Sequence, residues 1–423
     1  MVQTKNTRSN TQGNTMKGFY NRIGDRYLQK LTYGDLSVTY PDGTHKIYGN
    51  GLAPHASITL KRSVFFKRLA LYGDIGFAES YMDGDFECED LTSLITLALH
   101  NAKQLEALSE HEKKLSLYNL LPQFNRARHW MRKNSKTRSR KNISEHYDLS
   151  NDFFKLFLDE TMMYSSAVFS SSDETLHEAQ KRKIDLLAQK LRLKPNAKVL
   201  EIGSGWGSMA THLAREYDAK VTTLTLSNEQ LKLSQERFKT HGVEDSIDIL
   251  LQDYRDAQGE YDAIIAVEMF EAVGREYFDV FFKKCESLLA PSGVIAMQII
   301  TIPDQRYDAY CRGTDFIQKY IFPGGHLPSV SKLLETTSRH TRLNLLHMEE
   351  FTEDYAKTLK LWNENFHKKL EEVKKLGFDE YFIRMWRLYL TYCEAGFLTR
   401  NINLVQVVFT RDGNIHLNQG LSS

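Results

Sequence analysis

The chain has 423 residues, which exceeds one ordinary domain, so two domains or one large domain with an appendage are expected. Its 55 basic and 54 acidic side chains nearly balance, whereas a dedicated nucleic-acid-binding protein is expected to carry a strong positive excess. Apolar residues make up 41% of the chain, enough for a core, yet nowhere do eighteen of them run together as a membrane-spanning helix requires.

Cysteine and histidine usage gives no sign of a metal site or a disulfide framework. The 14 histidines include no H-E-x-x-H or similar ligand spacing, so no metal is predicted. The four cysteines form no C-x-x-C pair and are far apart along the chain: Cys88, Cys285, Cys311 and Cys393. We therefore expect a reducing, cytoplasmic compartment.

The N-terminal part of the chain reads as a polar tail followed by a small domain. Residues 1–17 are rich in Asn, Thr, Ser and Lys, lack an apolar signal segment, and are predicted to be disordered. Residues 36–49 alternate in polarity around Pro41-Asp42-Gly43, a turn signal that predicts a hairpin. Helical patterns interrupted by glycines follow from Ser63 to Leu99. Residues 18–120 are therefore expected to form a small α+β domain.

A basic linker is predicted at residues 121–145. Within it, residues 126–141 hold eight Lys or Arg and no acid. Such a run suits a solvated linker as well as contact with anionic lipid headgroups, where each basic residue near the surface contributes about 1 kcal/mol. Trp130 and Met131 inside the run favour an interface, so we expect peripheral contact with the inner face of a membrane.

Residues 146–423 show the alternation of strands and helices that is typical of a doubly wound parallel α/β sheet. Ligands of such sheets bind beyond the carboxyl ends of the strands, so the residues that end strands are candidates for the site. Helices are predicted at 174–191, directly after Gly207, at 230–239 and at 277–289. Strands are predicted at 198–202, 221–226, 247–253, 261–269, 293–301 and 405–413. The strand-end candidates are 203–207, 225–227, Asp253, 268–271 and 298–301.

The first of these strands runs into a turn with glycine at every second position, Gly203, Gly205 and Gly207. A helix follows, and glycines let the backbone at its start come close to a ligand. The spacing differs from the G-x-G-x-x-G of dinucleotide sites, and the Lys-Ser/Thr of a phosphate-binding loop is missing. The turn therefore points to a cofactor without a pyrophosphate, S-adenosylmethionine (SAM).

Six motifs, in this order and at these intervals, resemble the cyclopropane-fatty-acyl-phospholipid synthase family, with its mycolic-acid cyclopropane synthase and fatty-acid methyltransferase relatives: HYDLSNDFF, MYSSAVF, VLEIGSGWG, LTLSNEQ, MFEAVG and KYIFPGGHLPS. The resemblance extends from about Gly73 to Asp412. It implies a class I SAM-dependent methyltransferase fold with a helical cap insertion that binds lipid. It also implies that the acceptor is the cis double bond of a phospholipid acyl chain and the product a cyclopropane fatty acid.

The resemblance assigns cofactor-binding residues position by position. They are Tyr164, Ser165, Gly203, Gly205, Trp206, Thr225, Gln230, Asp253 and Tyr254. Asp253 and Tyr254 are expected to flank the adenine. The second strand ends in TLTLS and not in the acid that commonly binds the ribose hydroxyls, which fits this family. For Thr225 and Gln230 the alternative is helix capping and a solvent-facing amide.

Ring formation requires a base, because methyl transfer to a double bond leaves a carbocation that must lose a proton. In similar enzymes that base is a bound bicarbonate, and the residues implied to hold it here are Ser166, Glu271, Gln298, Ile300 and Tyr355. Ser166 and Gln298 replace a Cys and a His of the family motif, and Gln cannot carry a proton. The anion site is expected to be retained but altered, which leaves open a methyl- or methylene-branched product.

Other interpretations stay open at this point. Glu271 also suits a helix N-terminus, and Tyr320, Tyr355 and Trp362 also suit plain aromatic packing. A module that binds lipid or SAM without catalysis is a further alternative, against which the intact glycine turn counts. Methylation of nucleic acid or small molecules is disfavoured, because VEMFEAVG stands where an Asn/Asp-Pro-Pro-Tyr/Phe motif is expected. Similar proteins also suggest a homodimer formed through the N-terminal domain.

Overall fold

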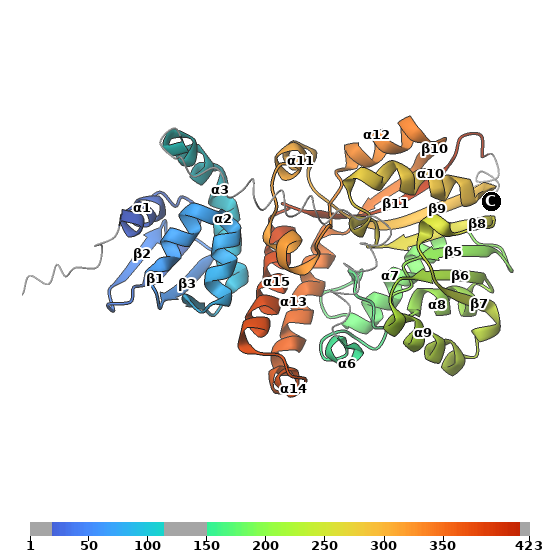
Figure 1. Ribbon diagram of the computed structural model, residues 1–423, viewed down its shortest axis with the longest axis horizontal. Helices are drawn as coiled ribbons and strands as arrows, with labels where there is room; N and C mark the ends of the chain where they lie inside the picture. The colour runs from blue at the N-terminus through green and yellow to red at the C-terminus, as the bar shows by residue number, and fades with distance from the viewer. Residues whose placement is uncertain (1–18, 114–149, 415–423) are drawn as a thin grey trace, which may run out of the picture. The chain divides into compact units, whose positions relative to one another are not determined.

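The computed structural model describes residues 19–113 and 150–414, without the side chains of residues 103–113 (Figure 1). Contacts divide the chain into two units, Met1–Ser116 and Leu117–Ser423. The predicted disorder of residues 1–17 and the basic run 126–141 lie outside the described residues. Within the described ranges, no helix has the length and apolarity needed to cross a bilayer.

The N-terminal unit combines a four-stranded sheet with three helices. The hairpin predicted around Pro41-Asp42-Gly43 is confirmed, because β1 (Asp35–Thr39) and β2 (His45–Gly49) pair antiparallel. The sheet order is β2-β1-β3-β4, in which β3 (His55–Leu60) runs parallel to β1, and neither β3 nor β4 (Phe86–Cys88) was predicted. The helices are α1 (Phe19–Leu28), α2 (Val64–Met82) and α3 (Leu91–Lys113).

The C-terminal unit is built on a seven-stranded sheet in the order β10-β11-β9-β8-β5-β6-β7. The strands are β5 (Lys198–Ile202), β6 (Lys220–Thr225), β7 (Ile247–Leu251), β8 (Tyr261–Val267), β9 (Leu289–Thr301), β10 (Leu343–Glu350) and β11 (Asn403–Arg411). The first five are parallel, as predicted, whereas β11 pairs antiparallel with both β9 and β10. β10 was not predicted: it is an edge strand that is exposed after its first residue, so it shows no apolar alternation.

Helices cover both faces of this sheet (Figure 1). Side chains of α7 (Leu176–Leu191), α8 (Ser208–Glu216) and α9 (Asn228–His241) share one apolar core with Val199, and those of α10 (Phe278–Leu288) and α12 (Val330–His340) share another with Leu200. Successive β5 side chains therefore enter opposite cores, as strand geometry requires. This arrangement confirms the predicted doubly wound fold.

A cap of helices follows β9 in the chain. The long helices α13 (Thr352–Lys368) and α15 (Glu380–Leu398) lie side by side (Figure 1). Their buried aromatic side chains pack against α6 (Asn151–Phe154), where Phe153 lies 5.0 Å from Trp386 between ring centroids. The shorter cap elements are α11 (Asp304–Tyr310), a π-helix at Ile317–Ile321 and α14 (Leu370–Lys375). Short 3-10 helices occupy Glu244–Ser246, Tyr254–Asp256, Phe270–Ala272 and Arg275–Tyr277.

Candidate active site

A cavity of about 160 Å³ lies at the carboxyl ends of β5, β6 and β8. One ordered water needs only about 10–15 Å³, so the space admits a ligand of many atoms. Eight of the nine residues predicted to bind the cofactor line it: Tyr164, Ser165, Gly203, Gly205, Trp206, Thr225, Gln230 and Tyr254. The structure thus brings together residues from five separate segments at the edge where an α/β sheet binds its ligand.

The glycine turn between β5 and α8 is built from left-handed backbone. Gly203, Gly205 and Gly207 have φ values of 96°, 49° and 83°, which side chains with a Cβ rarely adopt. A Cβ on Gly207 would lie 2.7 Å from the ring of Phe238, whereas one on Gly205 would meet nothing within 4 Å. Gly207 therefore permits close packing against α9, while Gly205 keeps the wall of the cavity open.

Thr225 and Gln230 act together after β6. The Thr225 hydroxyl donates to Oε1 of Gln230 across 2.8 Å, and both residues are buried on the cavity wall. The N-terminus of α9 is capped by Ser227, whose Oγ accepts from the Gln230 backbone N–H. The structure therefore does not support the alternative in which Thr225 caps the helix and the Gln230 amide faces solvent.

Asp253 is the one predicted cofactor residue outside the cavity lining. Its carboxylate forms an ion pair with Arg255, at 2.6 Å between Oδ2 and Nη2. Tyr254 does line the cavity, and its ring packs edge-on against Phe281 of α10 at 5.3 Å between centroids. The pair expected to flank an adenine is therefore split, with only Tyr254 facing the ligand space.

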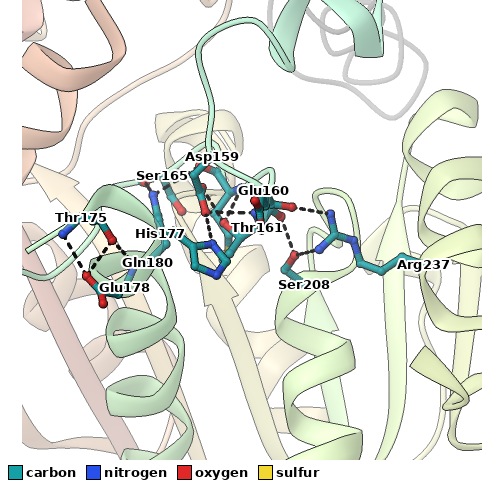
Figure 2. Close-up of polar contacts among 11 residues, drawn as sticks. Asp159, Glu160, Thr161, Ser165, Thr175, His177, Glu178, Gln180, Ser208 and Arg237 are labelled. Atoms are coloured by element: carbon teal, nitrogen blue, oxygen red, sulfur yellow. Dashed lines mark hydrogen bonds and ion pairs between the residues drawn. The ribbon is translucent and has the colours of Figure 1, made fainter. Parts of the chain in front are cut away.

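The segment that carries Tyr164 and Ser165 is held by side chains from α8 and α9 (Figure 2). Arg237 of α9 donates to Oγ of Ser208 at 2.5 Å and to the carbonyl of Glu160 at 3.2 Å. The hydroxyl of Ser208, the first residue of α8, donates in turn to the carbonyl of Thr161 at 2.5 Å. These contacts fix the backbone of one cavity wall to the two helices that follow the glycine turn.

Helix α7 holds the same segment from the other side. Gln180 donates to the carbonyl of Ser165 at 2.8 Å, and Nδ1 of His177 lies 3.1 Å from Oδ2 of Asp159 (Figure 2). Lys183 donates to the hydroxyl of Ser165 at 2.6 Å and is wholly buried, and this burial lowers the pKa of its ammonium to about 8. Lys183 therefore lies behind the cavity wall as an ammonium that loses its proton more readily than an exposed lysine does.

Glu268, directly after β8, is the polar centre of the cavity. Its Oε1 accepts from the backbone N–H of Ser166 and from Nε2 of Gln298, both at 2.8 Å. Its Oε2 accepts from the hydroxyl of Tyr355 at 2.5 Å. Three donors from α13, β9 and the 159–166 segment thus converge on one carboxylate that lines the cavity.

The backbone of Glu268 is strained and its charge is poorly solvated. Its φ of 48° lies in the left-handed region, which costs a residue with a Cβ about 1–2 kcal/mol. Desolvation raises the pKa of the carboxyl, while the hydrogen bonds from Tyr355 and Gln298 and the charge of Lys183 act in the opposite direction. Such strained, titratable residues in a cavity are characteristic of functional sites.

Gln298 is oriented by a chain of amides that leads to a lysine. Lys190 donates to Oε1 of Gln406, whose Nε2 donates to Oε1 of Gln298 at 2.9 Å. Because an ammonium can only donate, each amide in the chain must present its oxygen toward Lys190. The Gln298 amide is therefore turned so that its N–H₂ group faces Glu268.

Glu271 and Ile300 form a second, separate contact. The backbone N–H of Ile300 donates to Oε1 of Glu271 at 2.6 Å. The other carboxyl oxygen, Oε2, is buried and has no hydrogen-bond partner among the described residues. Burial, followed by the nearby charge of Glu268, raises the pKa of Glu271 to about 8, so this carboxyl is mostly protonated at neutral pH.

The five residues expected to hold a bicarbonate do not fit a separate anion as they are arranged. Ser166, Gln298 and Tyr355 give their donors to Glu268, and Ile300 gives its N–H to Glu271. Residues 268–271 were predicted from the sequence as candidates for the site because they end a strand, but no role was predicted for Glu268. The available signal was a second acid three residues before Glu271 in VEMFEAVG, at the end of a buried strand.

The aromatic insertion at residues 306–329 contributes no side chain to the lining of this cavity. Tyr355 and Trp362 do pack with other rings, since Tyr355 stacks on Phe397 at 4.4 Å, but the hydroxyl of Tyr355 is bound to Glu268. Lipid binding by the helical cap insertion therefore remains a prediction, while Tyr355 belongs to the polar site as well as to the packing.

Comparison with known proteins decides the family. The family described as mycolic acid cyclopropane synthetase matches residues 134–407, which is more than half of the chain. The chain belongs to the mycolic acid cyclopropane synthetase family. A domain of unknown function matches residues 23–110.

This member of the mycolic acid cyclopropane synthetase family is similar to proteins with two kinds of product. The tuberculostearic acid methyltransferase UfaA1 of Mycobacterium tuberculosis is 38% identical over 92% of this chain and 91% of its own length. The cyclopropane-fatty-acyl-phospholipid synthase of Escherichia coli K12 is also 38% identical, over 86% of this chain and 89% of its own.

Among solved structures, the mycolic acid cyclopropane synthase CmaA1 complexed with SAH and CTAB matches with a TM-score of 0.61 and 33% identity, covering 64% of this chain and 98% of that one. SAH is what remains of SAM after methyl transfer. The class I methyltransferase fold and the expected use of SAM are thereby confirmed, and the protein is an enzyme of the SAM-dependent methyltransferase type.

Proposed function

We propose that this protein transfers one carbon from SAM to the cis double bond of an unsaturated acyl chain in a membrane phospholipid and forms a cyclopropane fatty acid. The observation that carries the proposal is the position of Glu268, a carboxylate with three donors on the wall of a cavity that begins at the glycine turn. The names of the family members, a phospholipid synthase among them, support the lipid as acceptor.

The residues of the glycine-turn side suit a sulfonium cofactor. SAM supplies an electrophilic methyl group when it is bound. Gly205 leaves the backbone accessible, and Trp206 and Tyr164 contribute aromatic rings, which attract cationic ligands. The indole N–H of Trp206 is bound to Asn151 at 2.7 Å, so the ring is fixed before a ligand arrives. We assign cofactor binding to these residues together with Ser165, Gly203, Thr225, Gln230 and Tyr254.

The acceptor sets requirements of its own. A double bond is a weak nucleophile, so it must be held in line with the methyl group and away from water that would capture the resulting cation. The cation then loses a proton from the new methyl group as the third ring bond forms. No bound bicarbonate is included in this proposal, because three of the donors expected to hold that anion contact Glu268 and the N–H of Ile300 contacts Glu271.

A methylene-branched chain is the second candidate product. It is favoured by the substituted polar site, in which Ser166 and Gln298 surround Glu268, and by the likeness to a methyltransferase over 92% of the chain. In that case a hydride shift precedes loss of the proton, and the product is an isomer of the ring. A saturated methyl branch requires a separate two-electron reduction.

Contact with a membrane is part of the proposal. The run 126–141 carries eight basic residues and no acid, which suits anionic headgroups, and the phospholipid acceptor itself lies in a bilayer. We place the enzyme at the cytoplasmic face, as a peripheral protein, and infer a homodimer formed through the N-terminal domain. Flotation with anionic and neutral vesicles tests the membrane contact, and analytical ultracentrifugation tests the dimer.

The experiment that tests the reaction is incubation with methyl-labelled SAM and vesicles of unsaturated phospholipid, followed by analysis of the acyl chains. We expect label in the acyl fraction, and none when the phospholipid is fully saturated. Mass separates the ring and the methylene chain from a saturated methyl branch, and fragmentation separates the first two. SAM binding without label in any lipid would contradict the proposal and favour a non-catalytic module.

A further inference from the structure

The side chain of Glu268 is arranged like a bound anion. A carboxylate and a bicarbonate share a planar O–C–O group, and this one receives the Ser166 N–H and the Gln298 amide on one oxygen and the Tyr355 hydroxyl on the other. These three residues are among those that the sequence predicted to hold a separate anion. The chain therefore presents its own carboxylate to the donors that were expected to bind a ligand.

Two further features keep this carboxylate in place. The backbone N–H of Glu268 donates to the carbonyl of Gln298 at 2.8 Å, which ties the end of β8 to β9 despite the left-handed φ. The amide chain from Lys190 through Gln406 keeps the N–H₂ group of Gln298 turned toward Glu268. Strained backbone and a fixed second layer of hydrogen bonds are what a positioned catalytic group requires.

Among the carboxyl groups nearby, only Glu268 combines a place on the cavity wall with donors from three elements. Glu271 is absent from the lining, and its Oε1 is taken by Ile300. Glu201 lines the cavity, but its carboxyl accepts from the hydroxyl of Thr223 on the neighbouring strand β6 and has no donor from any other element among the described residues. Glu268 is therefore the carboxylate in the cavity lining that is oriented by hydrogen bonds from several elements.

We propose that Glu268 is the proton acceptor of the reaction and takes the place of an external bicarbonate. This inference rests on the proposed function. The electron pair of the double bond forms the new bond to the methyl carbon, and the bond between that carbon and sulfur breaks with its pair left on sulfur. A C–H bond of the new methyl group then breaks, and the proton passes to a carboxylate oxygen of Glu268. The electron pair of that bond closes the ring or, where a hydride shift has first moved the cation to the carbon that bears the methyl group, forms the methylene double bond.

The assignment accounts for the two substitutions in the site. A protein-borne carboxylate carries the proton itself, so neighbouring residues only have to orient it. Gln298 can donate a hydrogen bond but cannot exchange a proton. Ser166 gives its backbone N–H to Glu268 and accepts from Gln298 on its carbonyl, while its hydroxyl is turned to the carbonyl of Ala167. Neither residue needs the chemistry of the Cys or His that the family motif has at these positions.

The test compares label transfer in buffer freed of carbon dioxide with transfer in buffer that contains bicarbonate. We expect the wild-type rate to be the same in both, and Glu268→Gln to lose at least about 100-fold in either, as removal of a general base does. SAM affinity and thermal stability of each variant are measured alongside. The matched control is Glu276→Gln, which alters an exposed carboxylate in the 3-10 helix that follows and should keep the wild-type rate.

A second variant tests the donors themselves. Glu268→Ala frees the Ser166, Gln298 and Tyr355 donors, and added bicarbonate or formate should then restore part of the lost rate, with no effect on wild type. A wild-type enzyme that stops when bicarbonate is removed, a Glu268→Gln enzyme near the wild-type rate, or a Glu268→Ala enzyme that no small anion restores, would each count against Glu268 as the base. A wild-type chain that binds SAM yet labels no lipid in either buffer contradicts the proposed function itself.

Discussion

The hydroxyl of Tyr355 lies 2.5 Å from Oε2 of Glu268 and joins the helical cap to the end of strand β8. Tyr355 stands in α13 and Glu268 after β8, 87 positions apart in the chain. The cap thus contributes directly to the polar site, and its docking onto the sheet completes the set of donors around the carboxylate. A cap that moved away from the sheet would leave Oε2 without this partner.

Removing this contact should slow the reaction without unfolding the enzyme. Hydrogen bonds to charged groups contribute about 1.5–3 kcal/mol, so we expect Tyr355→Phe to lower the rate of label transfer about 10- to 100-fold. The ring still stacks on Phe397, and SAM affinity should stay within a factor of two to three of wild type. Tyr381→Phe removes a phenol from an exposed position of α15 and serves as the control. An unchanged rate in Tyr355→Phe would show that the contact is only structural.

Alanine substitutions of two glycines in the same turn, Gly205 and Gly207, should affect SAM affinity and stability differently. Gly205→Ala places a methyl group where nothing lies within 4 Å, so we expect a stability loss limited to the backbone strain of about 1–2 kcal/mol but a SAM affinity at least tenfold weaker. Gly207→Ala drives its Cβ into Phe238, which adds a packing cost of about 1–3 kcal/mol to the same strain. Isothermal titration and chemical denaturation separate the two effects. Equal SAM affinity in Gly205→Ala and wild type would mean that the cofactor does not approach this turn.

Arg237 should matter for cofactor affinity although it does not line the cavity. Arg237→Met removes the donors to Ser208 and to the carbonyl of Glu160, which loosens the segment that carries Tyr164. The loss of one such bond corresponds to a SAM affinity about tenfold weaker. Lys232→Met on the same helix breaks only an exposed ion pair with Glu229 and should leave the affinity unchanged. If both variants bind SAM like wild type, the segment is held without Arg237.

The buried carboxyl of Glu201 should make stability depend on pH. Burial raises the pKa of Glu201 to about 8, so between pH 4.5 and 8 the folded chain holds a proton that the unfolded chain has released. The contribution is fully present below pH 4.5, and the free energy of unfolding falls as the pH rises, by about 1.4 kcal/mol per pH unit for this group.

Glu201→Gln should remove that slope while keeping an oxygen that accepts from Thr223. The measurement is denaturant unfolding at several pH values without SAM, followed by the fluorescence of the buried tryptophans Trp206, Trp362 and Trp386. Glu216→Gln, at the exposed end of α8, is the control. Parallel pH curves for wild type and Glu201→Gln would contradict the assignment.

Much of the fold could be predicted because local patterns and local structure agree in it. The buried strands β5, β8 and β9 are mostly apolar over short stretches, and α7 combines helical spacing with a Thr175 capping box. β10 escaped prediction because an exposed edge strand has no apolar pattern, and the three-residue β4 is too short to show one. The antiparallel placement of β11 depends on tertiary pairing that no local pattern encodes.

Most of the residues that line the cavity on the cofactor side could also be predicted from local patterns, because they stand where strands end. The role of Glu268 was not, because it depends on which side chain reaches the donors of Ser166, Gln298 and Tyr355, and these lie on three other elements. The sequence places Glu268 and Glu271 three residues apart at one strand end, and only the left-handed backbone at Glu268 decides which of them turns toward the donors.

The pairing of β11 with β9 has a consequence for biosynthesis. Gln406 stands directly opposite Gln298 in this antiparallel register, and it is the link through which Lys190 orients the Gln298 amide. A nascent chain that has emerged only as far as β9 already contains every strand that borders the cofactor cavity, but the amide that faces Glu268 is not yet anchored. The Gln298 amide is therefore anchored toward Glu268 only once β11 has inserted into the sheet beside β9.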